Sequence, residues 1–217
     1  MGGRMAVGSF WAALGAVVVI AASQASGPAP LFFREDWAET PAALPITQDH
    51  VASQNVVLAL LGPGARQVKK SHHDRPADDP YYVWSGDAEA TWAVGLERRD
   101  ALVDLTVPGA RVRWRARQSG FRRLHLILRV DEATWIVSEQ ADGASDRWRE
   151  HEFLVRDLQW RELDITTVVE RRPVAAPDLS RVMAVGFTDL MRGGGTPASS
   201  RLDWIEVYGR AVGRGRP

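Results

Sequence analysis

The chain lacks cysteine altogether, and after its first 25 residues it has no hydrophobic run long enough to cross a membrane. The absence of cysteine excludes disulfides, thiol nucleophiles and a lipoprotein anchor. Lysine is scarce as well, because only Lys69 and Lys70 are present, and the 27 basic and 27 acidic residues cancel to a formal net charge of zero. The domain must therefore be stabilised by its hydrophobic core, and no overall charge attracts it to nucleic acid.

The first 25 residues have the pattern of a secretory signal peptide. Arg4 precedes the apolar run 6–22, and the small residues within 23–25 are typical of a cleavage site. We therefore expect a secreted or periplasmic protein that has no membrane span after cleavage. A retained membrane anchor is the alternative, because the run is close to the length that crosses a bilayer.

The rest of the chain is dominated by segments in which apolar and polar residues alternate, as they do along β-strands. Strands are predicted at residues 56–61, 92–98, 101–105, 111–117, 122–130, 134–139, 148–155, 163–168, 182–187 and 202–208. Short strands with frequent glycine and proline turns predict an all-β fold, an antiparallel β-sandwich or jelly roll in a single domain. We expect a short linker at 26–30, the domain at 31–211 and a flexible tail at 212–217.

The last predicted strand carries an acid on its apolar face. Asp203 is in phase with Ile205 and Val207, so we expect its side chain to point toward the core. A buried carboxylate needs a hydrogen bond, a cationic partner or a metal ion. Asp203 is therefore predicted to stabilise the architecture rather than to catalyse a reaction.

The segment 31–37, the segments 120–130 and 148–153, and the segment 202–207 together resemble the galactose-binding-like jelly rolls of many carbohydrate-binding modules. The resemblance implies non-catalytic glycan binding and no organic cofactor. In such modules an acid near the start and an aspartate on the last strand often share a structural calcium ion, and the matching residues here are Glu35 or Asp36 and Asp203. Oxygen ligands suit this hard cation. A hydrogen-bonded Asp203 without a metal is the alternative.

The opening residues 30–32 and the tryptophan-rich β character also resemble the lectin-type sandwich of bacterial 3-keto-disaccharide hydrolases. That likeness implies a carbohydrate-active hydrolase as an alternative function. A glycosidase needs two carboxylates at a defined separation, and the candidates are Asp74, Asp78 and Asp189, which no motif pairs. A second alternative is an envelope module that binds another protein.

The polar loop 69–86 is the strongest candidate for a ligand site. Its aromatic rings could cover the apolar face of a sugar while its polar groups bind the hydroxyls. The candidate ligand-binding residues of this loop are His72, His73, Asp74, Asp78, Asp79, Tyr81, Tyr82 and Trp84. The alternative is structural, with the histidines pinning the loop and the aromatic residues entering the core.

The glycine-rich loop 186–195 supplies two further candidates, Asp189 and Arg192. Glycines allow a close backbone approach, next to which these side chains could orient a ligand. The alternative is a wide connection between strands that contains a local salt bridge.

Four arginines alternate with apolar residues along the predicted strand 111–117. If this strand pairs with 122–130 as a hairpin, a cationic face forms that would suit an acidic poly- or oligosaccharide. The alternative is that the arginines form cross-strand ion pairs with Glu139, Glu150 and Glu152. Solvated pairs of this kind contribute only about 0–1 kcal/mol each.

Overall fold

The computed structural model describes Gly2, residues 28–192 and residues 198–215. The predicted signal peptide and the end of the predicted tail therefore lie outside the described residues. Within the described part of the chain, no helix is long and apolar enough to cross a membrane. The helical elements there are three single turns, η1 (Gln48–His50), η2 (Ala65–Gln67) and η3 (Val155–Asp157).

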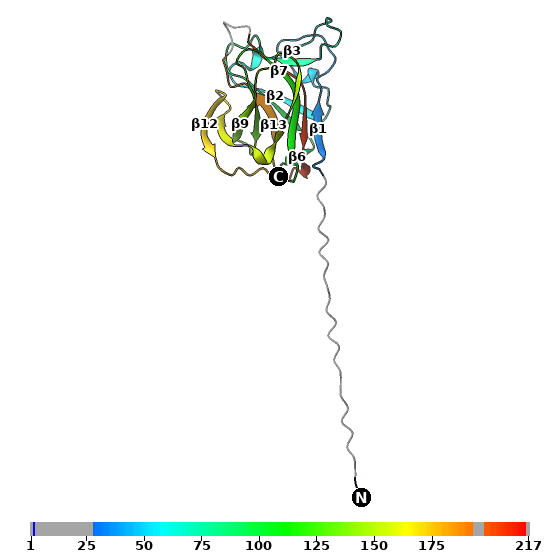
Figure 1. Cartoon of the computed structure of the whole chain (residues 1–217), viewed down its shortest axis with the longest axis vertical. Helices are drawn as coiled ribbons and strands as arrows, with labels where there is room; N and C mark the ends of the chain where they lie inside the picture. Colours follow the sequence, from blue (N-terminus) through cyan, green and yellow to red (C-terminus); the bar gives the residue numbers. More distant parts are fainter. Residues whose placement is uncertain (1, 3–27, 193–197, 216–217) are drawn as a thin grey trace.

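The fold is a sandwich of two antiparallel sheets, as the alternation predicted (Figure 1). The six-stranded sheet contains, in spatial order, β10 (Arg149–Leu154), β7 (Arg111–Gln118), β14 (Ser200–Tyr208), β4 (Tyr82–Trp84) and β3 (Lys69–Ser71), and β1 (Leu31–Glu35) also pairs with β14. The seven-stranded sheet contains β12 (Val169–Val174), β11 (Trp160–Asp164), β9 (Trp135–Asp142), β8 (Leu124–Arg129), β13 (Ala184–Thr188), β5 (Ala93–Arg98) and β2 (Val56–Leu61). A small ribbon joins β15 (Arg210–Gly213) to β6 (Ala101–Asp104).

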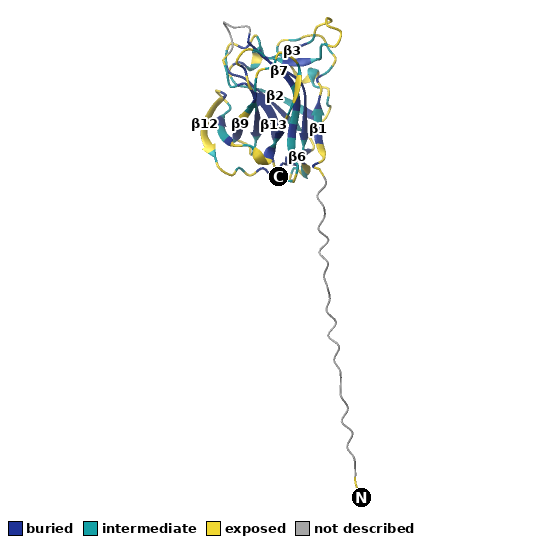
Figure 2. Cartoon of the chain, viewed as in Figure 1, coloured by how far each residue is buried: buried dark blue, intermediate teal, exposed yellow. Residues whose placement is uncertain are grey.

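The main core lies between the two sheets and is closed by large aromatic side chains. Trp37, Trp92, Trp114 and Phe187 are each at most 2% exposed, and aliphatic residues from both sheets surround them. Figure 2 shows these buried segments in the middle of the sandwich and the exposed ones along β12 and the loops. Burial of this much apolar surface supplies the stability that a chain without disulfides requires.

A second, smaller apolar cluster lies on the outer face of the seven-stranded sheet. It includes Trp135, Val137 and Val168, and the last of these has a left-handed backbone with a φ of 50°. The backbone carbonyl of Thr167 accepts a hydrogen bond of 2.6 Å from the Thr91 hydroxyl, which anchors this connection across the sheet. The predicted strand at 163–168 therefore overlaps β11 only at residues 163 and 164. Beyond β11 the chain turns, and Ile165 and Val168 pack on the outer face of the seven-stranded sheet.

The sequence analysis did not predict several of the short strands. The strands β3 and β4 have three residues each, and β12 and β15 are largely exposed on both faces, so none of these four shows a clear apolar alternation. The regular structure of β15 continues to Gly213, which places it two residues beyond the expected end of the domain at 211.

Candidate functional site

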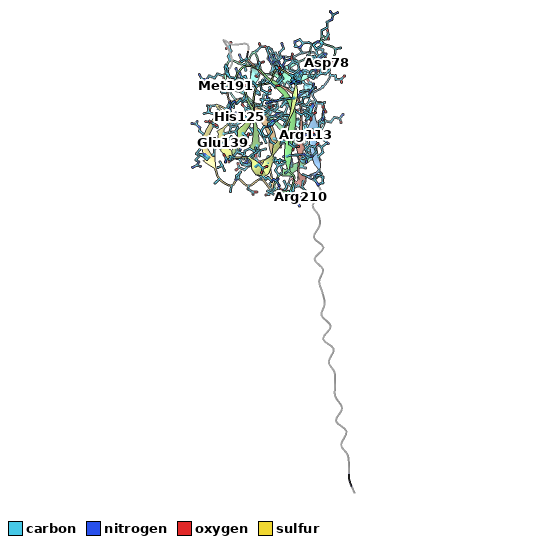
Figure 3. The ribbon with its side chains drawn as sticks, in the orientation of Figure 1. Asp78, Arg113, His125, Glu139, Met191 and Arg210 are labelled. Carbon is cyan, nitrogen blue, oxygen red and sulfur yellow. The ribbon has the colours of Figure 1, made fainter. Side chains whose placement is uncertain are left out.

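The outer face of the six-stranded sheet carries the four arginines of β7 that the sequence singled out. On β7, Val112, Trp114 and Ala116 are fully buried in the core, so the four alternating arginines face outward. Figure 3 shows Arg113 on this side of the molecule.

The hairpin between residues 111–117 and 122–130, on which a joint cationic face depended, does not form. The strand β7 pairs with β10 and β14, whereas β8 pairs with β9 and β13 in the other sheet. The short turn after Gln118 carries the chain from one layer of the sandwich to the other. The strands β7 and β8, which are consecutive in the chain, therefore belong to different sheets. Their polar side chains do not form one shared cationic surface.

Most of the β7 arginines have carboxylate partners. Arg111 lies 3.3 Å from Glu152, and Arg113 lies 2.7 Å from Glu150 and 3.2 Å from Glu206. These contacts are the cross-strand ion pairs that the sequence analysis gave as the alternative, although Glu139 instead pairs with Arg161. The ring of Trp204 lies beneath the guanidinium groups of Arg34 and Arg113, at 4.5 and 5.8 Å. This lower part of the face is therefore largely self-neutralised.

Asp203 lies on this outer face rather than toward the core. A β-bulge between Leu202 and Trp204 interrupts the alternation of β14, so Asp203 comes to lie beside the outward-facing Arg115 at 2.7 Å. Burial raises the pKa of Asp203, and Arg115 opposes that rise. The prediction that this carboxylate points inward is wrong for this reason. The bulge shows in the sequence only as a change of phase, because the buried Leu202 and Ile205 are three residues apart.

The other two residues of the predicted calcium site have protein partners of their own. Glu35 is fully buried and accepts hydrogen bonds from the backbone amides of Trp37, Ala52 and Ser53 at 2.7–3.0 Å. Asp36 pairs with Arg34 at 2.6 Å. Among the described residues, no group of three or more acidic or histidine side chains is arranged to hold a metal ion. The calcium ion stays a prediction from the sequence.

An aromatic pair occupies the upper part of the face, where loop 69–86 meets the sheet. The ring of Trp148, just before β10, contacts the ring of Tyr82 edge-on at 5.3 Å. Arg115 lies 5.6 Å from the ring of Trp148. His73 and Asp79 border the pair on the loop side, with 2.9 Å between the imidazole Nδ1 and the carboxylate and 3.3 Å between Nδ1 and the Tyr82 hydroxyl. Aromatic surface and fixed polar groups thus meet in one place.

The remaining candidates of this loop are divided between two environments. His72 stacks on Tyr81 at 4.1 Å, and the buried Lys70 lies over the other part of that ring, which anchors the loop from within. Asp74 and Asp78 are exposed to solvent, and Figure 3 shows Asp78 at the upper end of the molecule. The structure therefore assembles His73, Asp79 and Tyr82 with Trp148, which the sequence analysis did not include.

The two polar loops meet at a buried hub around Asp189. Its carboxylate accepts hydrogen bonds from Arg122 and Ser200 at 3.0 Å and from Ser85 at 3.4 Å. Burial raises the pKa of Asp189, and the charge of Arg122 opposes this rise. Asp189 is only 1% exposed, so its position indicates a structural role instead of the predicted contact with a ligand. Arg192, the second candidate of this loop, is exposed.

A cross-strand row lies above the aromatic pair. In register, Arg117 of β7 lies opposite Arg201 of β14, Arg201 lies opposite Trp84 of β4, and Trp84 lies opposite Lys69 of β3. The sequence analysis missed Arg201 and Lys69, because residues so far apart in the chain become neighbours only through strand register. A Cβ at Gly86 would lie 1.8 Å from the Trp84 ring, so only glycine leaves room for that ring.

Comparison with known proteins finds no matching family model and no matching curated protein. Among solved structures, the chain is similar to a family 11 carbohydrate-binding module from Clostridium thermocellum in complex with a β-1,3-1,4-mixed-linked tetrasaccharide. The TM-score is 0.43 at 10% identity, over 79% of this chain and 98% of the module. A family 11 module of a cellulosomal cellulase from the same organism gives a TM-score of 0.45 at 10% identity, over 80% and 97%.

A third similar structure is the carbohydrate recognition domain of Emp47p, with a TM-score of 0.33 at 8% identity, over 80% of this chain and 97% of that domain. These neighbours are carbohydrate-binding proteins by name, and all three TM-scores lie below 0.5. At such identities the likeness concerns the fold.

Proposed function

We propose that this protein is a secreted or periplasmic domain that binds glycans and does not cleave them. The observation that carries the proposal is the half-buried ring of Trp148, which the buried Tyr82 supports edge-on and which His73–Asp79 and Arg115–Asp203 border. An aromatic surface covers the apolar face of a sugar ring, and fixed donors and acceptors bind its hydroxyls.

The arrangement of the acids supports binding over hydrolysis. A glycosidase holds two carboxylates about 5–9.5 Å apart across the bond that it cleaves. Of the three candidates, Asp189 is buried beneath the surface and bonded to Arg122, while Asp74 and Asp78 are exposed on the loop. A hydrolase of the same chain would release reducing ends, and that release would be lost in Asp74→Asn or Asp78→Asn.

The proposal is tested by measuring the binding of the mature chain to a panel of neutral and acidic polysaccharides, with reducing ends assayed in the same samples. We expect binding without release of sugar, and Trp148→Ala should weaken it about tenfold or more, as loss of a stacking aromatic commonly does at a binding site. Tyr208→Ala is the matched control, because Tyr208 lies on the same face but stacks with Arg111 at 3.7 Å. Failure to bind any glycan would contradict the proposal.

Export is tested separately from binding. Cleavage after Ala25 should leave Ser26 as the first residue of the exported protein, which intact mass measurement would detect. An unprocessed chain that remains with the membrane fraction would support the retained anchor instead.

A further inference from the structure

The row formed by Arg117, Arg201, Trp84 and Lys69 carries positive charge without a counter-charge. In the lower part of the same face each β7 arginine meets a carboxylate, as Arg113 does with Glu206. In the part of the chain that the structure describes, the side chains of Arg117 and Arg201 have neither an ion pair nor a hydrogen bond. Lys69 contacts the Trp84 ring, with 5.2 Å from its Nζ to the ring centroid.

This arrangement costs stability in the free protein. Like charges that lie directly opposite each other on neighbouring strands repel, and Arg117 and Arg201 are such a pair. A bound anion would relieve the repulsion, and a guanidinium group binds a carboxylate or sulfate with two parallel hydrogen bonds. The row crosses the four neighbouring strands β7, β14, β4 and β3, so it extends over about 14 Å at the usual strand spacing of about 4.8 Å.

The buried hub around Asp189 holds the row in place. Ser200 and Ser85 both donate to Asp189, and each is the immediate neighbour of a member of the row, Arg201 or Trp84. The two positions are thus tied to one carboxylate beneath the sheet. A rigid arrangement of this kind reduces the entropy that is lost when a ligand binds.

We propose that this row binds the carboxylate or sulfate groups of an acidic glycan, with the exposed part of the Trp84 side chain against the sugar. The inference rests on the proposed glycan binding and adds the class of sugar. A nucleic acid is the less suitable anion, because the row offers three cations on a protein with a formal net charge of zero.

The test compares polygalacturonate with its fully methyl-esterified form, which keeps the same backbone but lacks the charge. Chondroitin sulfate and unsulfated chondroitin form the second pair and separate sulfate from carboxylate binding. We expect the full mature chain to bind a charged form at least about tenfold more tightly than its less charged partner, and we expect added salt to reduce that preference.

The variant that tests the row is Arg117→Gln combined with Arg201→Gln, which should lower the preference for the charged form about tenfold. Arg99→Gln combined with Arg156→Gln is the charge-matched control, since both arginines are exposed and lie outside the four strands of the row, and it should leave the preference unchanged. Equal binding of both members of each pair, or an unaffected row variant, would overturn this inference while leaving glycan binding intact. Binding of single-stranded DNA in place of every glycan would overturn both.

Discussion

The guanidinium of Arg122 donates to the carboxylate of Asp189 at 3.0 Å, and both side chains are almost completely buried. Asp189 also connects the two sheets. It directly follows β13 of the seven-stranded sheet, and it accepts a hydrogen bond from Ser200 of β14 in the six-stranded sheet. The glycine-rich loop and the polar loop 69–86 are therefore attached to one charged hub. The buried Arg122–Asp189 pair therefore holds the two loops of the candidate surface in position, although the pair itself is not accessible to a ligand.

Asp189→Asn should lower the free energy of unfolding by about 3 kcal/mol, because it leaves the buried Arg122 without a counter-charge. Denaturant unfolding measures the loss, and Asp146→Asn, at a side chain that is 94% exposed, should change little. The double variant with Arg122→Met should lose less than the sum of the two single variants. Strict additivity would show that the two side chains do not interact.

Gly186→Ala should destabilise the domain by about 3 kcal/mol or more, because overpacking against backbone cannot be relieved by rotating a side chain. A Cβ at this position would lie 1.9 Å from the backbone oxygen of Val94 on the neighbouring strand β5. Thermal unfolding measures the effect. Gly143→Ala is the control with open space around it, so a similar loss in both variants would contradict the close-approach argument.

The pH dependence of stability should carry a contribution from Glu35. Burial raises the pKa of Glu35 above its ordinary value, although three backbone amides favour the charged form. Because the folded protein holds the Glu35 proton more tightly than the unfolded chain does, protonation of Glu35 stabilises the fold. This contribution is complete below the pKa of the unfolded chain, about 4.3, and it is lost as the pH rises through the pKa of the folded state. The stability of the native chain relative to Glu35→Gln should therefore fall as the pH rises from about 4.3 through the pKa of the folded state. A relative stability that rises with pH would contradict the direction of the shift.

The predicted calcium ion is tested by thermal unfolding with and without a chelator. The metal-free alternative, in which Asp203 is paired with Arg115 and Glu35 is held by backbone amides, gives an unchanged melting temperature. A fall in melting temperature that calcium reverses would instead establish the metal clip between the chain ends. Asp203→Asn should destabilise the domain under either alternative, by about 1–3 kcal/mol, because Arg115 loses its partner.

The sequence alone determined the class of the fold, because alternation of apolar residues is a local property. The segment 56–61 was predicted with its observed bounds, and on β7 the inward set of Val112, Trp114 and Ala116 was predicted correctly. The same local pattern could not assign a strand to a sheet. It therefore left open whether 111–117 pairs with 122–130, and the structure places these strands in different sheets.

Only the tertiary structure decided which polar side chains become neighbours. A bulge turned Asp203 outward, and strand register brought Arg117 opposite Arg201 and Lys69 opposite Trp84. These contacts join residues far apart in the chain, so no short window of sequence contains them. The sequence specified the strands and their buried faces because each depends on near neighbours, whereas the candidate glycan surface depends on the pairing of distant strands.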